Sequence, residues 1–164
     1  MATRRPTPPE APTLYVAEPP AAYGRRPRLV VDASVLAAAL FGEERHAIAV
    51  TMLLIRSLAA PQLVDYEIGN VALKKRRAGQ IDEADVAGAL ADFLALDLTR
   101  FPVDVAATLV LAERYKLSAY DAAYLWLAET LATPLATFDD KLAAVARKHL
   151  PGGASPPSFD SNFR

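Results

Sequence analysis

The feature that most constrains the fold is an aliphatic run at residues 28–32, RLVVD, that ends in an acid. Short β-branched runs of this kind are typical of buried strands. Two more segments, at 96–101 and 134–137, also predict strands. The remaining segments predict helices at 34–41, 44–59, 63–78, 82–95, 104–116, 122–131 and 139–149. Strands that alternate with helices predict an α/β fold, in which a short, mostly parallel sheet is flanked by helices on both faces.

Prolines divide the chain into three segments. Seven of the thirteen prolines lie in residues 1–27, and three more lie between Pro151 and Pro157. Since proline breaks helices and cannot donate a hydrogen bond to a sheet, we expect extended tails at 1–27 and 151–164. The region 28–150 is then one folded domain, long enough to bury a core without disulfides.

Composition narrows the chemistry that the chain can perform. It has 52% hydrophobic residues, a net charge of -1, no cysteine and two histidines. These values exclude a disulfide framework, a thiolate zinc site and a three-histidine metal site within one chain. The longest uncharged apolar run, Ala47 to Ile55, is too short to span a bilayer. We therefore expect a cytoplasmic protein without a membrane segment, whose polar chemistry rests mainly on carboxylates.

Four acids lie where the predicted elements begin or end. Asp32 ends the first strand, and Asp139 follows the last one. Glu67 and Asp121 lie in the first turns of predicted helices. Ligand sites in open α/β sheets lie beyond the carboxyl ends of the strands, where helix N-termini also point. We therefore expect these four acids to converge on one edge of the sheet.

A cluster of carboxylates favours a bound metal ion. Neighbouring carboxylates repel one another, so a cluster without a cation raises its own pKa values or recruits a metal. Oxygen ligands suit Mg²⁺ or Mn²⁺, and such ions can activate water for attack on a phosphodiester. The alternative is structural, because the three aspartates also occupy helix-capping positions and Glu67 can be an ordinary solvated residue. Spacing alone does not separate these interpretations.

Four motifs follow one another along the predicted domain. They read LVVDASVL at 29–36, PQLVDYEIGNV at 61–71, SAYDAAYLWLAE at 118–129 and LATFDDKL at 135–142. From about Leu29 to Leu150, this order resembles the PIN-domain ribonucleases and is most similar to VapC, the toxin of VapBC toxin–antitoxin pairs. The resemblance implies a PIN-like three-layer fold and metal-dependent cleavage of RNA.

The resemblance also assigns roles to individual residues. The family's four acids, which bind Mg²⁺ or Mn²⁺ and carry catalysis, map onto Asp32, Glu67, Asp121 and Asp139. Ser34 and Thr137 are candidate supporting residues, and Asp140 can assist or replace its neighbour. The family further implies an RNA substrate, a homodimer and a VapB-like antitoxin that buries a segment near the acidic cleft.

Polar side chains follow Glu67 along the same predicted helix. Asn70 is one turn on and can orient the glutamate, although a plain surface amide is an equally good interpretation. Position 74 is two turns on and returns close to the same face. Cations there can hold an RNA phosphate, or they can complement the helix dipole. The candidates for phosphate contact are Lys74, Lys75, Arg76 and Arg77.

The aromatic residues Tyr120, Tyr124 and Trp126 lie on or beside an apolar helix. Stacking on single-stranded RNA is one role for them, but packing in the core or in a dimer is the commoner one. Taken together, the sequence predicts a metal-dependent endoribonuclease that acts as the toxin of a type II toxin–antitoxin pair. The alternative is a PIN-like module that binds RNA or a partner without cutting, because such a module would keep the same acids.

Overall fold

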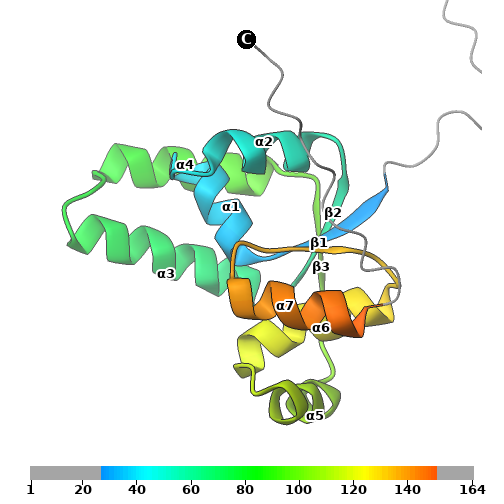
Figure 1. Ribbon diagram of the computed structural model, residues 1–164. Helices are drawn as coiled ribbons and strands as arrows, with labels where there is room; N and C mark the ends of the chain where they lie inside the picture. Colours follow the sequence, from blue (N-terminus) through cyan, green and yellow to red (C-terminus); the bar gives the residue numbers. More distant parts are fainter. Residues whose placement is uncertain (1–26, 151–164) are drawn as a thin grey trace, which may run out of the picture.

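The computed structural model describes residues 27–150 of the chain, as shown in Figure 1. The sequence interpretation of 1–27 and 151–164 as tails falls outside these residues, apart from Pro27. The strands are β1 (Arg28–Val31), β2 (Ser57–Pro61), β3 (Leu98–Phe101) and β4 (Leu135–Ala136). The helices are α1 (Ala33–Leu40), α2 (His46–Leu54), α3 (Val64–Arg77), α4 (Glu83–Ala95), α5 (Val105–Tyr115), α6 (Ala119–Thr130) and α7 (Asp140–His149).

The strands form one parallel sheet in the order β3-β2-β1-β4. Leu29 of β1 pairs with Leu58 of β2, and Val30 of β1 pairs with Leu135 of β4. Helices α1 to α4 gather on one side of the sheet, and α5 to α7 gather on the other (Figure 1). This arrangement confirms the predicted α/β fold, with a short parallel sheet between two helical layers.

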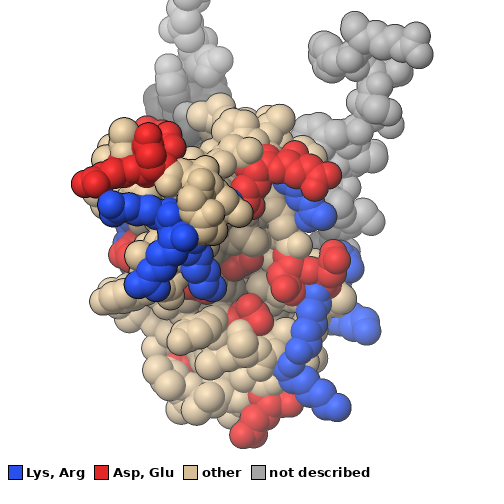
Figure 2. Space-filling model, turned by 90° about the vertical axis from the view of Figure 1, so that its left-hand side faces the viewer, with Lys and Arg blue, Asp and Glu red and all other residues tan. Residues whose placement is uncertain are grey.

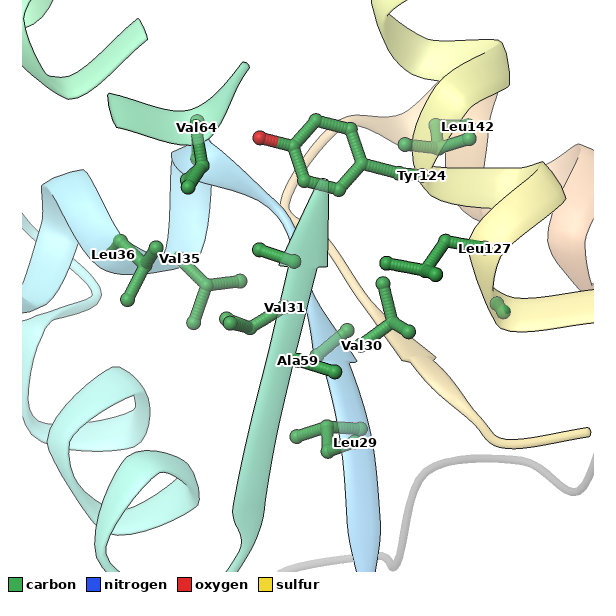
Figure 3. Close-up of a cluster of buried hydrophobic side chains, with 14 of the residues drawn as sticks. Leu29, Val30, Val31, Val35, Leu36, Ala59, Val64, Tyr124, Leu127 and Leu142 are labelled. Carbon is green, nitrogen blue, oxygen red and sulfur yellow. The ribbon is translucent and has the colours of Figure 1, made fainter. Parts of the chain in front are cut away.

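The core lies on both faces of the central strands. Val30 and Val31 are completely buried. Figure 3 shows Leu36 of α1 on one side of β1 and Leu127 of α6 on the other. Burying an aliphatic side chain of this size stabilises a fold by roughly 1.5–3 kcal/mol. The two apolar layers therefore fix how α1 and α6 are placed relative to the carboxyl ends of the strands.

The predicted helix at 44–59 is wrong in its second half. Helix α2 ends at Leu54, and residues 57–61 form β2, which pairs with both β1 and β3. The sequence of β2, SLAAP, is short and almost uniformly apolar, so its period does not distinguish a strand from a buried helix. It becomes a strand because its backbone pairs on both sides in the interior of the sheet.

The other helices lie close to their predicted positions. Asp82 and Asp104 cap α4 and α5 through their side chains, as the sequence indicates. Gly79 follows α3 with a positive φ of 68°, a conformation that favours glycine and ends the helix. Within residues 27–150, no helix is long and apolar enough to cross a membrane.

Candidate functional site

The four acids lie where strands end and helices begin. Asp32 follows β1 and is the N-cap of α1, and Asp139 follows β4 and is the N-cap of α7. Glu67 and Asp121 lie in the first turns of α3 and α6. Because β1, β2 and β4 run parallel, their carboxyl ends share one edge of the sheet. In folds of this class the ligand lies beyond that edge.

Asp32 is buried and held by hydroxyl groups. Asp32 is only 7% exposed. Its Oδ2 accepts hydrogen bonds from Ser34 Oγ at 2.6 Å and from Thr137 Oγ1 at 2.8 Å. Burial raises the pKa of Asp32, while the bonds from Ser34 and Thr137 act in the opposite direction. Both predicted supporting hydroxyl residues therefore contact this carboxylate.

Glu67 lies close enough to Asp32 and Asp121 for their charges to act on its carboxylate. Its pKa is raised from 4.5 to about 7, mainly by burial, and the negative charges of Asp32 and Asp121 raise it further. A hydrogen bond from Tyr124 acts in the opposite direction. Figure 2 shows carboxylate atoms inside a hollow near the middle of one face, with lysine and arginine side chains on both sides. The electrostatics thus link Asp32, Glu67 and Asp121 in one acidic cluster.

The backbone of Asp139 is connected to this cluster through Thr137. Its N–H donates to Thr137 Oγ1 at 2.9 Å, and the same hydroxyl donates to Asp32. Its carboxylate is exposed and caps α7, with Oδ1 accepting from the Leu142 N–H at 2.7 Å. The capping role considered from the sequence is therefore present at Asp139, and a ligand role remains a proposal.

Within the described part of the chain, the two remaining predicted supporting residues, Asn70 and Asp140, do not contact Asp32 or Glu67 by hydrogen bonds. Asn70 is exposed on α3, and Asp140 is exposed in the first turn of α7. Among the side-chain hydrogen bonds of residues 27–150, none joins either residue to Asp32 or Glu67. The structure therefore joins Ser34 and Thr137 to the acidic cluster by hydrogen bonds, and within residues 27–150 it gives no such bond to Asn70 or Asp140.

The oxygen ligands of the cluster suit a hard divalent cation, but the side chains are not arranged as a coordination sphere. In the described part of the chain, no three His, Cys, Asp or Glu residues stand in position to hold a metal ion. Hydroxyl groups occupy Oδ2 of Asp32 and Oε2 of Glu67. The ion pairs within that part leave the cluster without a cationic partner. Oxygen-only donors with unneutralised negative charge are what Mg²⁺ or Mn²⁺ requires.

Tyr124 is a site residue whose contact the sequence analysis missed. It is 1% exposed, and its hydroxyl donates to Glu67 Oε2 at 2.5 Å. Burial, together with the nearby charge of Glu67, raises the pKa of Tyr124 well above its usual range, so the hydroxyl keeps its proton. The available signal was its position three residues after Asp121, which places both on one helix face.

Among the described residues, two of the four basic residues at the end of α3 form ion pairs, and two do not. Lys75 forms an ion pair with Glu43 at 2.8 Å, and Arg76 forms one with Glu83 at 3.1 Å. Within residues 27–150, Lys74 and Arg77 form no ion pair, and both are exposed. A full two turns of helix separate Glu67 from Lys74, an axial distance of about 10 Å. Lys74 and Arg77 are therefore the two of these four cations whose charges are not paired within the described residues.

A further cation, Arg45, contacts the residue that follows Thr137. The Arg45 guanidinium lies 4.9 Å from the centre of the Phe138 ring, next to the Thr137 that binds Asp32. A pocket of about 260 Å³ there is lined by Ala38, Glu43, Glu44, Arg45 and Phe138. Its position comes from the loop between α1 and α2, for which the sequence offered no motif.

Comparison with known proteins places the chain in a family. The PIN domain family model matches residues 29–148. The VapC ribonuclease Mb0985 of Mycobacterium bovis is 36% identical over 125 residues, which are 75% of this chain and 94% of that protein. Ribonuclease VapC3 of Pyrobaculum aerophilum is 33% identical over 121 residues, covering 71% of this chain and 92% of that protein.

Two solved structures share the fold. The crystal structure of PAE2754 from Pyrobaculum aerophilum has a TM-score of 0.58 and 28% identity, covering 72% of this chain and 85% of that one. The crystal structure of Mycobacterium tuberculosis VapC20, described as a sarcin-ricin loop cleaving toxin, has a TM-score of 0.54 and 20% identity, covering 71% of this chain and 94% of that one. The predicted resemblance is confirmed, and the chain belongs to the PIN-domain family, among relatives that are VapC ribonucleases.

Proposed function

We propose that this PIN-domain ribonuclease, an endoribonuclease toxin of the VapBC kind, hydrolyses RNA phosphodiester bonds with Mg²⁺ or Mn²⁺ held by its acidic cluster. The proposed ligands are Asp32, Glu67, Asp121 and Asp139. The similarity to proteins named as ribonucleases favours this function over the alternative of a PIN-like module that binds without cutting.

One observation carries the metal proposal. The pKa of Glu67 rises to about 7 because the side chain is buried beside the charges of Asp32 and Asp121. Crowded carboxylates repel one another and oppose folding, and either a bound proton or a bound cation relieves that repulsion. A divalent ion removes that repulsion, and the fold supplies only oxygen ligands for it.

The chain's own residues then divide the work. When bound, the ion would supply a Lewis acid for a water and for the phosphodiester. Ser34 and Thr137 hold Asp32 by hydrogen bonds to one oxygen, which leaves its other oxygen available. Lys74 and Arg77 hold the negatively charged RNA backbone near the acids, so that an acidic site can accept an anionic substrate.

The proposal includes the toxin's partners. A VapB-like antitoxin binds near the acidic cluster and keeps the enzyme inactive, and two copies of the chain form a homodimer. We expect the activity in the cytoplasm, where the proposed RNA substrate and antitoxin are made. The support for these partners is the chain's similarity to proteins named VapC ribonucleases, because VapC is the toxin of VapBC pairs.

The test is RNA cleavage by the purified protein with EDTA, Mg²⁺ or Mn²⁺, beside an Asp32→Asn variant. We expect cleavage only with a metal, and none by the variant, because asparagine keeps the volume and the hydrogen-bond acceptor but removes the charge. Circular dichroism and antitoxin binding should match the wild-type protein. Metal-independent cleavage would disprove the metal site, and an unfolded variant would show that the fold itself needs the charge of Asp32.

A further inference from the structure

The hydrogen bond between Tyr124 and Glu67 joins two helices that are far apart in sequence. Glu67 lies on α3 and Tyr124 lies on α6, 57 residues later. Figure 3 shows the Tyr124 ring projecting from α6 across the ends of the strands, with its hydroxyl toward Val64 of α3. Val64 lies three residues before Glu67, one turn earlier on the same helix. The phenol therefore bridges the sheet edge at the acidic cluster.

Packing of the Tyr124 ring in the core does not account for its hydroxyl group, which needs a hydrogen-bond partner. Tyr124 is 1% exposed, so its hydroxyl cannot rely on bulk water and needs a partner inside the protein. The partner is one carboxylate oxygen, Oε2 of Glu67, at 2.5 Å. A phenylalanine would fill almost the same space against the core without making this contact. The hydroxyl is therefore a feature of the acidic cluster rather than of the apolar packing.

The bond also fixes which part of Glu67 is available. A free glutamate has three rotatable side-chain bonds, and a hydrogen bond to one oxygen removes most of that freedom. Asp121 precedes Tyr124 by three residues on α6, so one helix face presents both its carboxylate and the phenol to Glu67. With Oε2 held by Tyr124, Oε1 is the oxygen left for other partners, and no described hydrogen bond reaches it.

We propose that Tyr124 is a positioning residue that holds the Glu67 carboxylate ready for a divalent cation. The proposal rests on the metal site put forward above. Groups that hydrogen-bond a metal ligand orient it before the ion arrives, and losing one of them typically weakens metal binding by about 10- to 100-fold. Tyr124 stands in that relation to Glu67.

The experiment compares Tyr124→Phe with wild type by calorimetric titration of the metal-free protein with Mn²⁺, without RNA. We expect the dissociation constant to rise by about 10- to 100-fold. Tyr115→Phe is the matched control, because its hydroxyl bonds His149 at 2.8 Å, away from the cluster, and its loss should leave Mn²⁺ affinity unchanged. A Tyr124→Phe variant that binds Mn²⁺ as tightly as wild type overturns the proposal.

The outcomes of this titration distinguish two kinds of failure. If wild-type protein binds no Mn²⁺, the metal site itself is disproved and the role of Tyr124 falls with it. If wild type binds and Tyr124→Phe is unaffected, only the positioning role is lost. If the variant does not fold, a second measurement on wild-type protein takes the place of its titration. This measurement follows the ¹³C resonance of the Tyr124 carbon that carries the hydroxyl. Mg²⁺ should shift that resonance and leave the one of Tyr115 in place, and an unmoved Tyr124 signal overturns the proposal.

Discussion

Helices α4 and α6 begin with the same sequence spacing, a capping residue followed three positions later by an aspartate. At α4 the pair is reciprocal, because the Asp85 N–H donates to Asp82 at 2.8 Å and the Asp82 N–H donates to Asp85 at 2.9 Å. At α6 the first half is present, with the Asp121 N–H donating to Ser118 Oγ at 3.0 Å. Within the described residues, the Asp121 carboxylate accepts no bond in return.

The difference lies in what each carboxylate faces. Asp85 is exposed at the start of α4, and its charge is used locally to complete a capping box, which is worth about 1 kcal/mol. Asp121 is half-buried and raises the pKa of Glu67 through its charge. A carboxylate that crowds another acid is destabilising unless a proton or a cation neutralises the pair. The same local motif therefore completes a capping box in one helix, and in the other it leaves a carboxylate free for the proposed metal site.

The strongest test of this contrast removes one charge from each helix. Asp121→Asn should reduce metal-dependent RNA cleavage by more than about 100-fold, beyond the loss typical of a residue that only supports a ligand. Its metal-free melting temperature should not fall, since the change relieves repulsion with Glu67. Cleavage rates at fixed Mn²⁺ and thermal denaturation measure the two effects.

Asp85→Asn is the matched control, with the same chemical change at the same helix position. Asparagine still accepts the bond from the Asp82 N–H, so only a few tenths of a kcal/mol of helix-dipole energy are lost. Cleavage should equal wild type. If Asp121→Asn also cleaves at the wild-type rate, the Asp121 carboxylate has no role in cleavage and the contrast between the two helices collapses.

Most of the fold could be predicted because its signals are local. Capping aspartates, Gly79 after α3 and the aliphatic run of β1 each act within a few residues of their position. Strand β2 could not be predicted in this way, because SLAAP has no period of its own and its identity comes from pairing with β1 and β3. Backbone hydrogen bonds to distant segments decide such a strand.

The candidate site divides along the same line. The acids could be found because the carboxyl ends of parallel strands converge, a rule that follows from topology. The contact of Tyr124 with Glu67 could not, because an aromatic residue in an apolar helix is indistinguishable from ordinary core until its hydroxyl partner is known. The pairing of Lys75 with Glu43 depends likewise on a loop whose path the sequence does not reveal.

The second prediction uses pH to read the strain in the acidic cluster. The folded pKa of Glu67, about 7, lies above its ordinary 4.5, so the folded state binds a proton more tightly than the unfolded state. The stability that this gives is complete below about pH 4.5 and is lost as the pH rises toward about 7. Burial of Asp32 acts in the same direction.

Thermal denaturation of the metal-free protein should therefore show a melting temperature that falls across this pH range. Glu67→Gln should flatten most of that slope, because the titrating group is gone. Adding Mg²⁺ should raise the melting temperature more at the upper end of the range than at the lower, since the ion competes with protons for the carboxylates. A metal-free protein that becomes more stable with rising pH would falsify the idea of a crowded acidic cluster.

The third and smallest effect concerns the cations of α3, which divide like the aspartates into locally paired and unpaired groups. Lys75 and Arg76 are bound to Glu43 and Glu83, whereas Lys74 and Arg77 are available to an incoming phosphate. The double change Lys74→Ala and Arg77→Ala should raise the KM for RNA by roughly 3- to 10-fold, with kcat nearly unchanged, and should make binding less sensitive to salt.

Arg76→Ala provides the matched loss of one cation at the same end of the helix. Its surface ion pair with Glu83 is worth about 0–1 kcal/mol, so this variant should change the melting temperature slightly and the KM hardly at all. An equal rise in KM for Arg76→Ala would mean that RNA senses only the net charge of α3. A rise confined to the double variant would mean that the ion pairs on α3 determine which cations are free to bind the substrate. The two aspartates differ in the same way, because Asp85 is used in a capping box and Asp121 is left free for the proposed metal.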